Sequence, residues 1–502
     1  MIKLYKNNTY QWFKKDNVNT IGYAFYKDSL YEDEKLANFI YQSKENLETI
    51  LQDMNGYFSI VIEEDECIIL VSDIIRSFPV FYNNKGDISD DIDVFKRELN
   101  ELSIEELQQA RWVSGDDTIY QNVKQLQNAS IVYLYKNGHT EKKKYFRYKY
   151  VNNASYSFKE LDIVFQKMID RTIKYLNGRT AVIPLSGGGD SRLLAYYLKE
   201  KGYKNIITYT YGSERFGEVE TSKKIAKFLN LPWYFVEYNE KKCKKIYNDK
   251  KMHHNIMDYL GNGYSIPHIQ ELEAVYELLD KKIINKECVI LPGFSLGFLT
   301  GSHVNQVFLN TDKTDVKVVL EKIYANNYNL TKKDNSIFDG KLKKLLELQE
   351  GTIDSRKGAD CCEQYDFEER QAKFINNAIR VYDYFGMKWY LPFWDKDLIA
   401  FWEKVSLKDK YKKDFFIRFC NYKYGDLMNY APLWHRTKRK LSSYKKISLI
   451  WKNYYQNPLN FFYYFGFKKY LKYVILERNF NYDYYAARDY VNYIKEEKKN
   501  GV

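Results

Sequence analysis

The sequence predicts an α/β protein in which a layered sheet domain precedes a parallel sheet covered by helices, with a helical C-terminal extension. Three observations predict this fold class. Short β-rich runs fill the first 150 residues, strands and helices alternate from about residue 178, and the pattern is mostly helical beyond about residue 265. The chain has 502 residues, enough for two or three domains, and we predict boundaries at 1–150, 151–428 and 429–502.

The first two regions differ in the rhythm of their apolar residues. In the first, β-rich runs separated by turns lie at 58–62, 68–71, 79–82 and 131–135. In the second, strands at 181–185, 206–211 and 233–236 alternate with helices at 192–201 and 218–229. Alternation of this kind is typical of a parallel sheet because each parallel crossover needs a helix-length connection.

Composition excludes several classes of protein. Hydrophobic residues make up 45% and charged residues 29%, as in ordinary globular proteins, although 49 Tyr and 30 Phe are unusual. No apolar run approaches the roughly 20 residues of a membrane span, and the first residues hold no apolar signal core, so we expect a cytoplasmic protein. The six cysteines form no CxxC pair and predict neither a disulfide framework nor a structural metal site.

The positive charge is concentrated in one segment. Residues 427–476 hold ten Lys or Arg and no Asp or Glu, which accounts for +10 of the net charge of +12. The remainder is almost neutral, so we expect no general nucleic-acid partner. Aromatic residues interleave with the basic ones in 434–476. This pattern is compatible with a packed helical tail, with peripheral contact to the inner face of a membrane or a sugar-lipid, or with RNA binding.

The most informative stretch is PLSGGGDSR at 184–192, which follows an apolar strand and opens a helix. Glycines allow a tight turn and close backbone approach, and a helix start offers unpaired N–H groups to an anion. The nucleotide loop that ends in Gly-Lys-Ser/Thr needs a lysine where Asp190 stands, so transfer of a γ-phosphoryl group by that route is excluded. The alternative interpretation is a glycine turn capped by Asp190 or Ser191.

The string SGGGDS resembles the SGGxDS loop of ATP pyrophosphatases, and the order of the surrounding motifs resembles the asparagine synthetase family. That resemblance implies an N-terminal Ntn-type (α+β) sheet domain, then a parallel-sheet ATP-pyrophosphatase domain of the adenine nucleotide α-hydrolase-like type. It implies that the loop binds the pyrophosphate of ATP, with Asp190 as a catalytic residue that holds Mg²⁺. The loop residues are Ser186, Gly187, Gly188, Gly189, Asp190 and Ser191.

Further motifs extend the resemblance toward the C-terminus. Tyr211 and Gly212 end the second strand, where the family has adenine contacts, and Gly293 matches a glycine-rich loop. The stretches RVYDYFG at 380–386 and LPFWD at 391–395 resemble late family motifs. Lys413 lies where the family has a lysine that faces the phosphates, which implies a catalytic role in charge stabilisation.

The N-terminal region resembles a glutaminase domain at 51–58, 73–82 and 118–123, yet it lacks the reactive group. Such a glutaminase needs a cysteine with a free amine as base, exposed after removal of Met1, and position 2 is Ile2. No thiol or aliphatic hydroxyl precedes Thr9. We therefore predict no glutamine hydrolysis. The nitrogen would come as ammonia from solution or from a separate glutaminase, or as an amine already on the substrate.

A second departure lies at 291–303, where Gly297 and Phe298 occupy the positions of two expected acids. This stretch is nearer to the version found in synthetase homologues of bacterial surface-polysaccharide clusters. Two interpretations stay open: Mg²⁺ bound by Asp190, waters and ATP oxygens, or loss of catalysis. Three further residues, His268, His303 and Glu271, fit either a substrate contact or a structural role.

Together these motifs predict ATP-dependent amide formation through an acyl-adenylate, with release of AMP and pyrophosphate. The expected cofactors are ATP and Mg²⁺, and the expected substrate is a small carboxylate, either a sugar acid of surface-polysaccharide assembly or an amino acid. Asparagine synthesis, closure of a lactam or peptide ring, and a catalytically inactive binding protein are the alternatives. Sulfur transfer needs a reactive cysteine, and no motif marks one.

Overall fold

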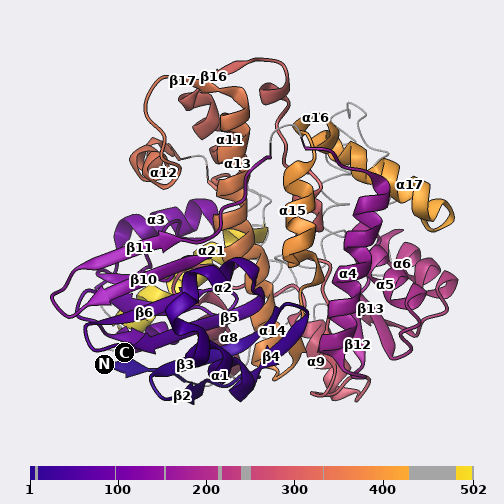
Figure 1. Cartoon of the computed structure of the whole chain (residues 1–502), viewed down its shortest axis with the longest axis horizontal. Coiled ribbons are helices and arrows are strands. Elements are labelled where there is room, and N and C mark those ends of the chain that lie inside the picture. The colour runs from indigo at the N-terminus through magenta and orange to yellow at the C-terminus, as the bar shows by residue number, and fades with distance from the viewer. Residues whose placement is uncertain are drawn as a thin grey trace.

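A computed structural model describes residues 1–5, 9–95, 98–151, 154–212, 217–238, 250–331, 333–428 and 482–499. Figure 1 shows antiparallel sheets on the N-terminal side, a parallel sheet with its helices on the opposite side, and a helical lobe with a small hairpin at the top. The α/β fold class predicted from the sequence is confirmed.

The N-terminal region is built from two sheets. The larger is antiparallel throughout, in the order β11-β10-β6-β5-β3-β2 with β4 paired to β3. Its strands are β2 (Phe13–Lys15), β3 (Val18–Tyr26), β4 (Ser29–Glu32), β5 (Asn55–Glu63), β6 (Cys67–Ser72), β10 (Ser130–Tyr135) and β11 (Thr140–Lys144). The smaller sheet joins β1 (Ile2–Lys3), β8 (Ile88–Ser89), β7 (Phe81–Asn83) and β9 (Val123–Gln125). The helices of this region are α1 (Asp33–Ser43), α2 (Leu47–Asp53) and α3 (Glu101–Ala110).

The second sheet is parallel, and its strand order creates a ligand crevice. The strands are β12 (Ala181–Pro184), β13 (Ile206–Gly212), β14 (Trp233–Glu237), β15 (Val289–Ile290) and β18 (Lys388–Trp389), in the order β14-β13-β12-β15-β18. The chain first runs outward from β12 to β14 and then returns to the other side of β12. Such a reversal opens a crevice at the carboxyl ends of the two central strands, where ligands of open α/β sheets bind.

Helices form most of the remaining structure. Those next to the parallel sheet are α4 (Phe158–Leu176), α5 (Gly189–Glu200), α6 (Gly217–Phe228), α9 (Leu272–Asp280) and α14 (Ile379–Tyr384), and α8 (Lys250–Gly261) packs against α14. The upper lobe holds α11 (Val316–Asn327), α12 (Asp339–Leu345), α13 (Ser355–Tyr365) and the hairpin of β16 (Lys313–Asp315) with β17 (Thr352–Asp354). The others are α10 (Leu296–Leu299), α15 (Lys396–Lys404), α16 (Leu407–Lys410), α17 (Asp414–Met428) and α21 (Tyr482–Lys499).

Aromatic residues join the two sheet regions. Tyr23 of β3 stacks on Tyr175 of α4, with ring centroids 4.2 Å apart, and its hydroxyl donates to the carbonyl of Trp389 in β18 at 2.7 Å. The hydroxyl of Tyr57 donates to the carbonyl of Leu391. Buried tyrosine combines a large apolar area with a hydroxyl that needs a partner, so it suits an interface between two sheets. The high Tyr content therefore has a structural role at this junction.

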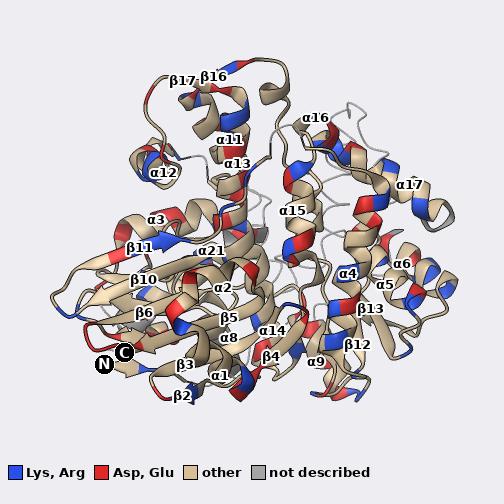
Figure 2. Cartoon of the chain, viewed as in Figure 1, with Lys and Arg blue, Asp and Glu red and all other residues tan. Residues whose placement is uncertain are grey.

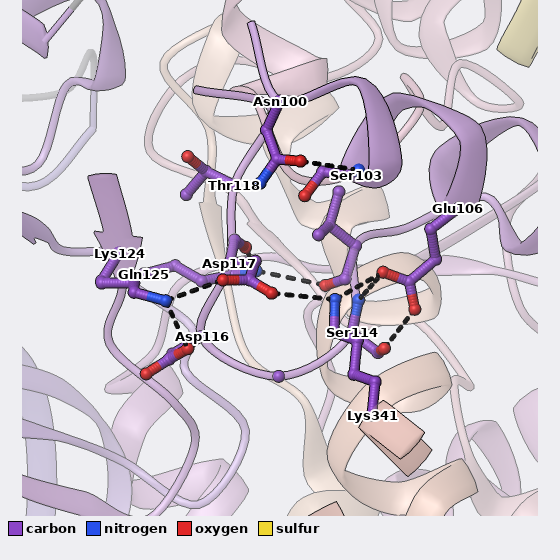
Figure 3. A network of polar contacts seen from close by, with 12 residues as sticks. Asn100, Ser103, Glu106, Ser114, Asp116, Asp117, Thr118, Lys124, Gln125 and Lys341 are labelled. Atoms are coloured by element: carbon purple, nitrogen blue, oxygen red, sulfur yellow. Dashed lines mark hydrogen bonds and ion pairs between the residues drawn. The ribbon is translucent and has the colours of Figure 1, made fainter. Parts of the chain in front are cut away.

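A polar network fastens the N-terminal region to the upper lobe (Figure 3). Glu106 of α3 is fully buried and pairs with Lys341 of α12 at 2.7 Å. It also accepts hydrogen bonds from the backbone N–H of Ser114 at 3.2 Å and from the hydroxyl of Tyr328 at 2.6 Å. Lys341 in turn contacts Asp117 at 3.1 Å. A buried carboxylate with this many fixed partners is a structural group.

The C-terminal helix α21 packs against α3 and α8. Asp483 pairs with Arg111 at 2.6 Å, and the hydroxyl of Tyr490 accepts from the backbone N–H of Gly263 at 3.0 Å. The basic aromatic stretch 434–476, for which we predicted a tail, lies outside the described residues. In the described part, Figure 2 shows basic and acidic residues interspersed along the helices, and no helix there combines the length and apolar content needed to cross a membrane.

Candidate active site

The glycine loop lies between β12 and α5, at the carboxyl edge of the parallel sheet. Its conformation is held by two serines: the N–H of Ser186 donates to Oγ of Ser191 at 3.0 Å, and the N–H of Gly188 donates to Oγ of Ser186 at 3.1 Å. Helix α5 begins at Gly189 without a side-chain cap. Its first N–H groups and the positive end of its dipole are therefore available to an anion.

Two residues outside the predicted set also hold this loop. Arg192 is buried and its Nη2 donates to the carbonyl of Gly187 at 2.9 Å. Burial lowers the pKa of Arg192 to about 10. Glu218, at the start of α6, accepts a hydrogen bond from the N–H of Gly187 at 3.2 Å. The sequence predicts a helix that begins at residue 218, but no local pattern indicates that the carboxylate of Glu218 reaches the loop.

Gly293 allows a second loop to lie directly against the first. A Cβ at position 293 would lie 2.9 Å from the backbone nitrogen of Ser191, closer than real Cβ contacts. The chain reaches this point because β15 pairs with β12, and Leu291 continues the pairing by donating its N–H to the carbonyl of Val182 at 2.8 Å. Glycine is needed here for close approach of two backbones.

Asp190 and Lys413 face one another across the crevice. The ammonium of Lys413 lies 3.9 Å from Oδ1 of Asp190. Burial raises the pKa of Asp190, and the Lys413 charge and a hydrogen bond from the N–H of Gly297 oppose that rise. Lys413 and its neighbour Lys412 both have left-handed backbone, with φ of 62° and 56°. Two consecutive non-glycine residues in this region store strain, as occurs at functional sites.

One cavity of about 460 Å³ unites these elements, within the usual size range of small-molecule sites. Of the predicted site residues, those that line it are Ser186, Gly188, Gly189, Asp190, Ser191, Tyr211, Gly293 and Lys413. Gly187 and Gly212 are not part of the lining, although each is adjacent in sequence to a residue that is. Other lining residues are Pro184, Leu185, Tyr209, Thr210, Glu218, Gln270, Glu271, Pro292 and Phe294. Sequence reasoning had weighed only Glu271 among this second group as a substrate contact.

Glu271 lines the cavity next to β13. Its side chain is buried, and Oε2 accepts hydrogen bonds from the hydroxyls of Tyr209 and Tyr382, the latter at 2.9 Å. No lysine, arginine or histidine of the described chain forms an ion pair with it. Burial raises the pKa of Glu271 to about 7, and the two tyrosine hydrogen bonds oppose this. The cavity therefore contains a carboxyl group that titrates near neutral pH.

The two histidines considered as substrate contacts do not line the cavity. His303 Nδ1 lies 2.6 Å from Oδ2 of Asp366, and its ring is next to Arg370. His268 is partly buried and packs against Phe374, with ring centroids 5.0 Å apart, and desolvation lowers its pKa. Both positions are compatible with structural roles.

For Mg²⁺ the cavity offers Asp190 as its candidate ligand. Gly297 and Phe298 contribute no acid, and the described residues contain no group of three or more metal-ligating side chains. Mg²⁺ often takes only one or two protein carboxylates and completes its shell with waters and substrate phosphates. The residues therefore fit an ion held jointly by Asp190 and a bound triphosphate, in which the ion would neutralise phosphate charge. They do not form a metal site made by the protein alone.

Comparison with known proteins gives short, distant similarities. No family model matches the chain. The tRNA-specific 2-thiouridylase MnmA of Chlamydia trachomatis is 29% identical over 119 residues, 21% of this chain and 31% of that protein. The 7-cyano-7-deazaguanine synthase of Caldicellulosiruptor bescii is 40% identical over 58 residues, 11% and 26% of the two chains. The chain thus matches about a third or less of the length of these curated relatives.

Among solved structures, the NH₃-dependent NAD synthetase of Campylobacter jejuni aligns with a TM-score of 0.22 and 15% identity, over 29% of this chain and 59% of that one. The glutamine phosphoribosylpyrophosphate amidotransferase of B. subtilis, complexed with ADP and GMP, aligns with a TM-score of 0.19 and 11% identity, over 45% and 72%. The sequence similarities are to PP-loop ATP pyrophosphatases. They do not single out the asparagine synthetase family, so that finer resemblance stays a prediction.

Proposed function

We propose that this protein is an ATP-dependent ligase of the PP-loop type, which activates a carboxylate by adenylation and transfers the acyl group to an amine. The observation that carries the proposal is the single cavity at the sheet crevice, which brings together the glycine loop, Asp190 and Lys413. The distant similarity to ATP-using PP-loop enzymes supports the same chemistry at a general level.

The proposed reaction has two steps. A carboxylate oxygen attacks the α-phosphorus of ATP, the bond between the α-phosphorus and the bridging oxygen breaks, and pyrophosphate leaves with the electron pair. An amine then attacks the acyl carbon, AMP leaves, and the amine loses a proton to give the amide. Negative charge grows on the departing pyrophosphate in the first step. The N–H groups at the uncapped start of α5 and the ammonium of Lys413, 3.9 Å from Asp190, would stabilise that charge.

We infer that the amine is ammonia from solution or from a separate glutaminase, or an amine already present on the substrate. The N-terminal sheet supports this because Ile2 in β1 packs an apolar side chain against a hydrophobic cluster and offers no nucleophile. For the carboxylate we propose a sugar acid of surface-polysaccharide assembly. This rests on the glycine-rich stretch 291–303 alone. An amino acid, or a substrate that closes its own lactam or peptide ring, would satisfy the same cavity.

Sulfur transfer is the chemistry named for the MnmA relatives, and the described cysteines do not favour it. Burial raises the pKa of Cys361 to about 11 and the pKa of Cys362 well above its ordinary value. Burial also raises the pKa of Cys67 and of Cys420. A sulfur carrier needs an accessible thiolate with a lowered pKa. Cys243 lies outside the described residues.

A second candidate function is a nucleotide-binding protein without catalysis. The specific observation in its favour is that Gly297 and Phe298 stand in the loop beside Asp190 at the two positions where the family resemblance predicts acidic residues. In this alternative the cavity still binds ATP, but no substrate releases pyrophosphate from it.

The deciding experiment measures Mg²⁺-dependent release of pyrophosphate and AMP from ATP, with ammonium present and a panel of sugar acids, aspartate and other amino acids. We expect release with one class of carboxylate and no release by the Asp190→Ala variant. ATP binding by calorimetry with no release across the panel would support the non-catalytic alternative. Absence of both binding and release would overturn the proposal.

A further inference from the structure

One acidic side chain in the cavity has no part in the proposed phosphate chemistry. Glu271 lines the cavity beside residues of β13 and at the start of α9. The two tyrosine hydroxyls that it contacts both donate to Oε2. Within the described chain no hydrogen bond reaches Oε1 of Glu271. This atom is also not among the fully buried side-chain atoms that lack a hydrogen-bond partner, so it keeps some contact with solvent. One carboxylate oxygen is thus anchored while the other is available to a ligand.

The position of the loop determines which part of a nucleotide reaches Glu271. With the phosphates at the N-terminus of α5, we place the nucleoside along the residues of β13 that line the cavity. Tyr209 is paired in register with Pro184, the last residue of β12, so its side chain begins level with the edge from which the loop departs. The lining residues that a base could contact on the β13 side of the cavity are Tyr209, Tyr211 and Glu271, together with Thr210 and Gln270.

An unpaired carboxylate in such a place selects for a hydrogen-bond donor. Adenine carries an exocyclic amino group on C6, which donates, whereas a purine without that group offers no donor there. A buried carboxylate costs free energy unless a donor satisfies it, so a ligand that supplies the donor binds more tightly than one that does not. The tyrosines fix the carboxylate, because both are fully buried and their hydroxyls come from different elements, β13 and α14.

We propose that Glu271 is a specificity-determining residue of the nucleotide site, and that its free carboxylate oxygen accepts a hydrogen bond from the amino group of adenine. The proposal rests on the proposed function, because it requires ATP phosphates at the glycine loop. It adds a side-chain contact to the base and gives the buried carboxylate of Glu271 a role in the cavity.

The contact should depend on pH, since only the ionised carboxylate is a strong acceptor. The titratable groups that act on Glu271 are tyrosines: Tyr209 and Tyr211 on β13 and Tyr382 on α14. They keep their protons in the neutral range because burial raises their pKa values well above the ordinary one. Any change of selectivity between pH 6 and 8 would therefore report on Glu271 itself.

The test compares the binding of ATP with that of purine riboside triphosphate, which lacks only the amino group on C6. Because the two share the triphosphate, its own protonation cancels in the ratio of dissociation constants. We expect wild-type protein to bind ATP more tightly by about 10-fold to 100-fold at pH 8, and the ratio to fall at pH 6. In Glu271→Gln the ratio should shrink to a few-fold and lose its pH dependence. Glu273→Gln, a buried acid on the same helix that does not line the cavity, should leave the ratio unchanged.

A second variant keeps the test decisive if Glu271→Gln does not fold. In Tyr382→Phe the carboxylate loses a stabilising hydrogen bond, so its pKa rises and the selectivity for ATP should appear only at higher pH than in wild type. A wild-type ratio near one, a ratio unaffected by both substitutions, or a pH profile unmoved in Tyr382→Phe would overturn the inference. Failure of the wild-type protein to bind ATP at all would instead overturn the proposed function.

Discussion

Two buried glutamates of this protein have opposite surroundings. Glu106, in the junction with the upper lobe, has a lysine, a serine and a tyrosine as fixed partners (Figure 3). Glu271, which lines the cavity, has only two tyrosine hydroxyls as partners and no described cation. A buried charge that is fully paired holds the fold together, whereas one left without a counter-charge lowers stability. The difference fits a structural role for Glu106 and the ligand contact that we propose for Glu271.

The largest effect should follow from removal of the cation beside Glu106. In Lys341→Met the carboxylate remains buried without its counter-charge, which costs about 3–5 kcal/mol. The loss would appear as a lower free energy of unfolding in urea. The ion pair with Asp117 contributes to this cost: burial would raise the pKa of Asp117, but the charges of Lys341 and Lys124 outweigh burial and hold it at about 2.

A rescue separates this explanation from simple loss of packing. The double variant Lys341→Met with Glu106→Gln removes both charges and should recover part of the lost stability, since an unpaired charge is no longer buried. Lys333→Met removes an exposed lysine that pairs with Glu105, and should change stability by no more than about 0.5 kcal/mol. Equal stability of the single and double variants would contradict the paired-charge account.

Removal of the charge of Glu271 should raise the free energy of unfolding at pH 8, whereas removal of the charge of Lys341 should lower it. The pKa of Glu271 is raised by burial from 4.5 to about 7, so the folded state holds a proton between those pH values that the unfolded state releases. Stability therefore falls as pH rises from about 4.5 to 7. Above pH 7 the ionised group costs about 3 kcal/mol, from 1.36 kcal/mol per unit of pKa. Glu271→Gln should remove this dependence and be the more stable protein at pH 8.

Urea unfolding of both proteins at pH 5 and pH 8 measures this directly. The stabilities should be similar at pH 5 and diverge at pH 8 in favour of Glu271→Gln. Glu106→Gln provides a contrast, because that substitution leaves the ammonium of Lys341 without its nearest carboxylate and should destabilise at both pH values. Parallel pH profiles for wild type and Glu271→Gln would show that Glu271 is ionised in the folded protein at pH 5 as well.

These two glutamates also show how far the sequence leads. Local patterns were sufficient for the β-rich runs, for the alternation around the parallel sheet and for the loop at 186–191, because strand, turn and helix signals are written within a few residues. The environment of Glu271 depends on Tyr382, which lies 111 residues away, and on Tyr209, which lies 62 away. No short-range pattern records that such residues meet in space.

The residues of the candidate site also divide into those that a sequence motif predicts and those whose contacts depend on the fold. The glycine loop and Gly293 were predicted by their motifs, and Lys413 by its place in the order of motifs. Glu218 was missed, because its contact with the loop depends on where α6 begins relative to β12. His303 was considered as a substrate contact because it follows a glycine-rich loop, yet its ring pairs with Asp366, 63 residues further on.

Lys413 offers the next comparison, since its charge should matter for chemistry and not for the fold. Lys413→Met removes the ammonium that faces Asp190, and we expect pyrophosphate release to fall about 100-fold, the usual cost of one group that stabilises transition-state charge. The free energy of unfolding should stay close to that of wild type. Lys412→Met is the matched control, because Lys412 lies over the ring of Tyr411 outside the cavity lining. Equal losses of activity in the two variants would show that local backbone strain, not the Lys413 charge, is responsible.

The smallest effects should distinguish two glycines of one loop. A Cβ at position 293 would lie 2.9 Å from the backbone nitrogen of Ser191, so Gly293→Ala must displace the glycine loop and should cost about 2 kcal/mol of stability together with ATP affinity. At position 297 a Cβ would meet only side-chain ends, Nζ of Lys413 at 3.2 Å and Oδ2 of Asp190 at 3.4 Å. These groups can move, and alanine favours the short helix α10, so stability should change by less than about 1 kcal/mol.

Calorimetric binding of ATP, measured beside urea unfolding, completes this last comparison. Gly293→Ala should lose affinity and stability together, because one backbone contact determines both. Gly297→Ala should keep its stability and show only a modest change of affinity, arising from displacement of the Lys413 ammonium away from Asp190. If Gly297→Ala instead unfolds as readily as Gly293→Ala, then packing requires the glycine at 297. If it stays folded, the fold tolerates a side chain there, and the space beside Asp190 is used by the Lys413 ammonium where the resemblance led us to expect an acid.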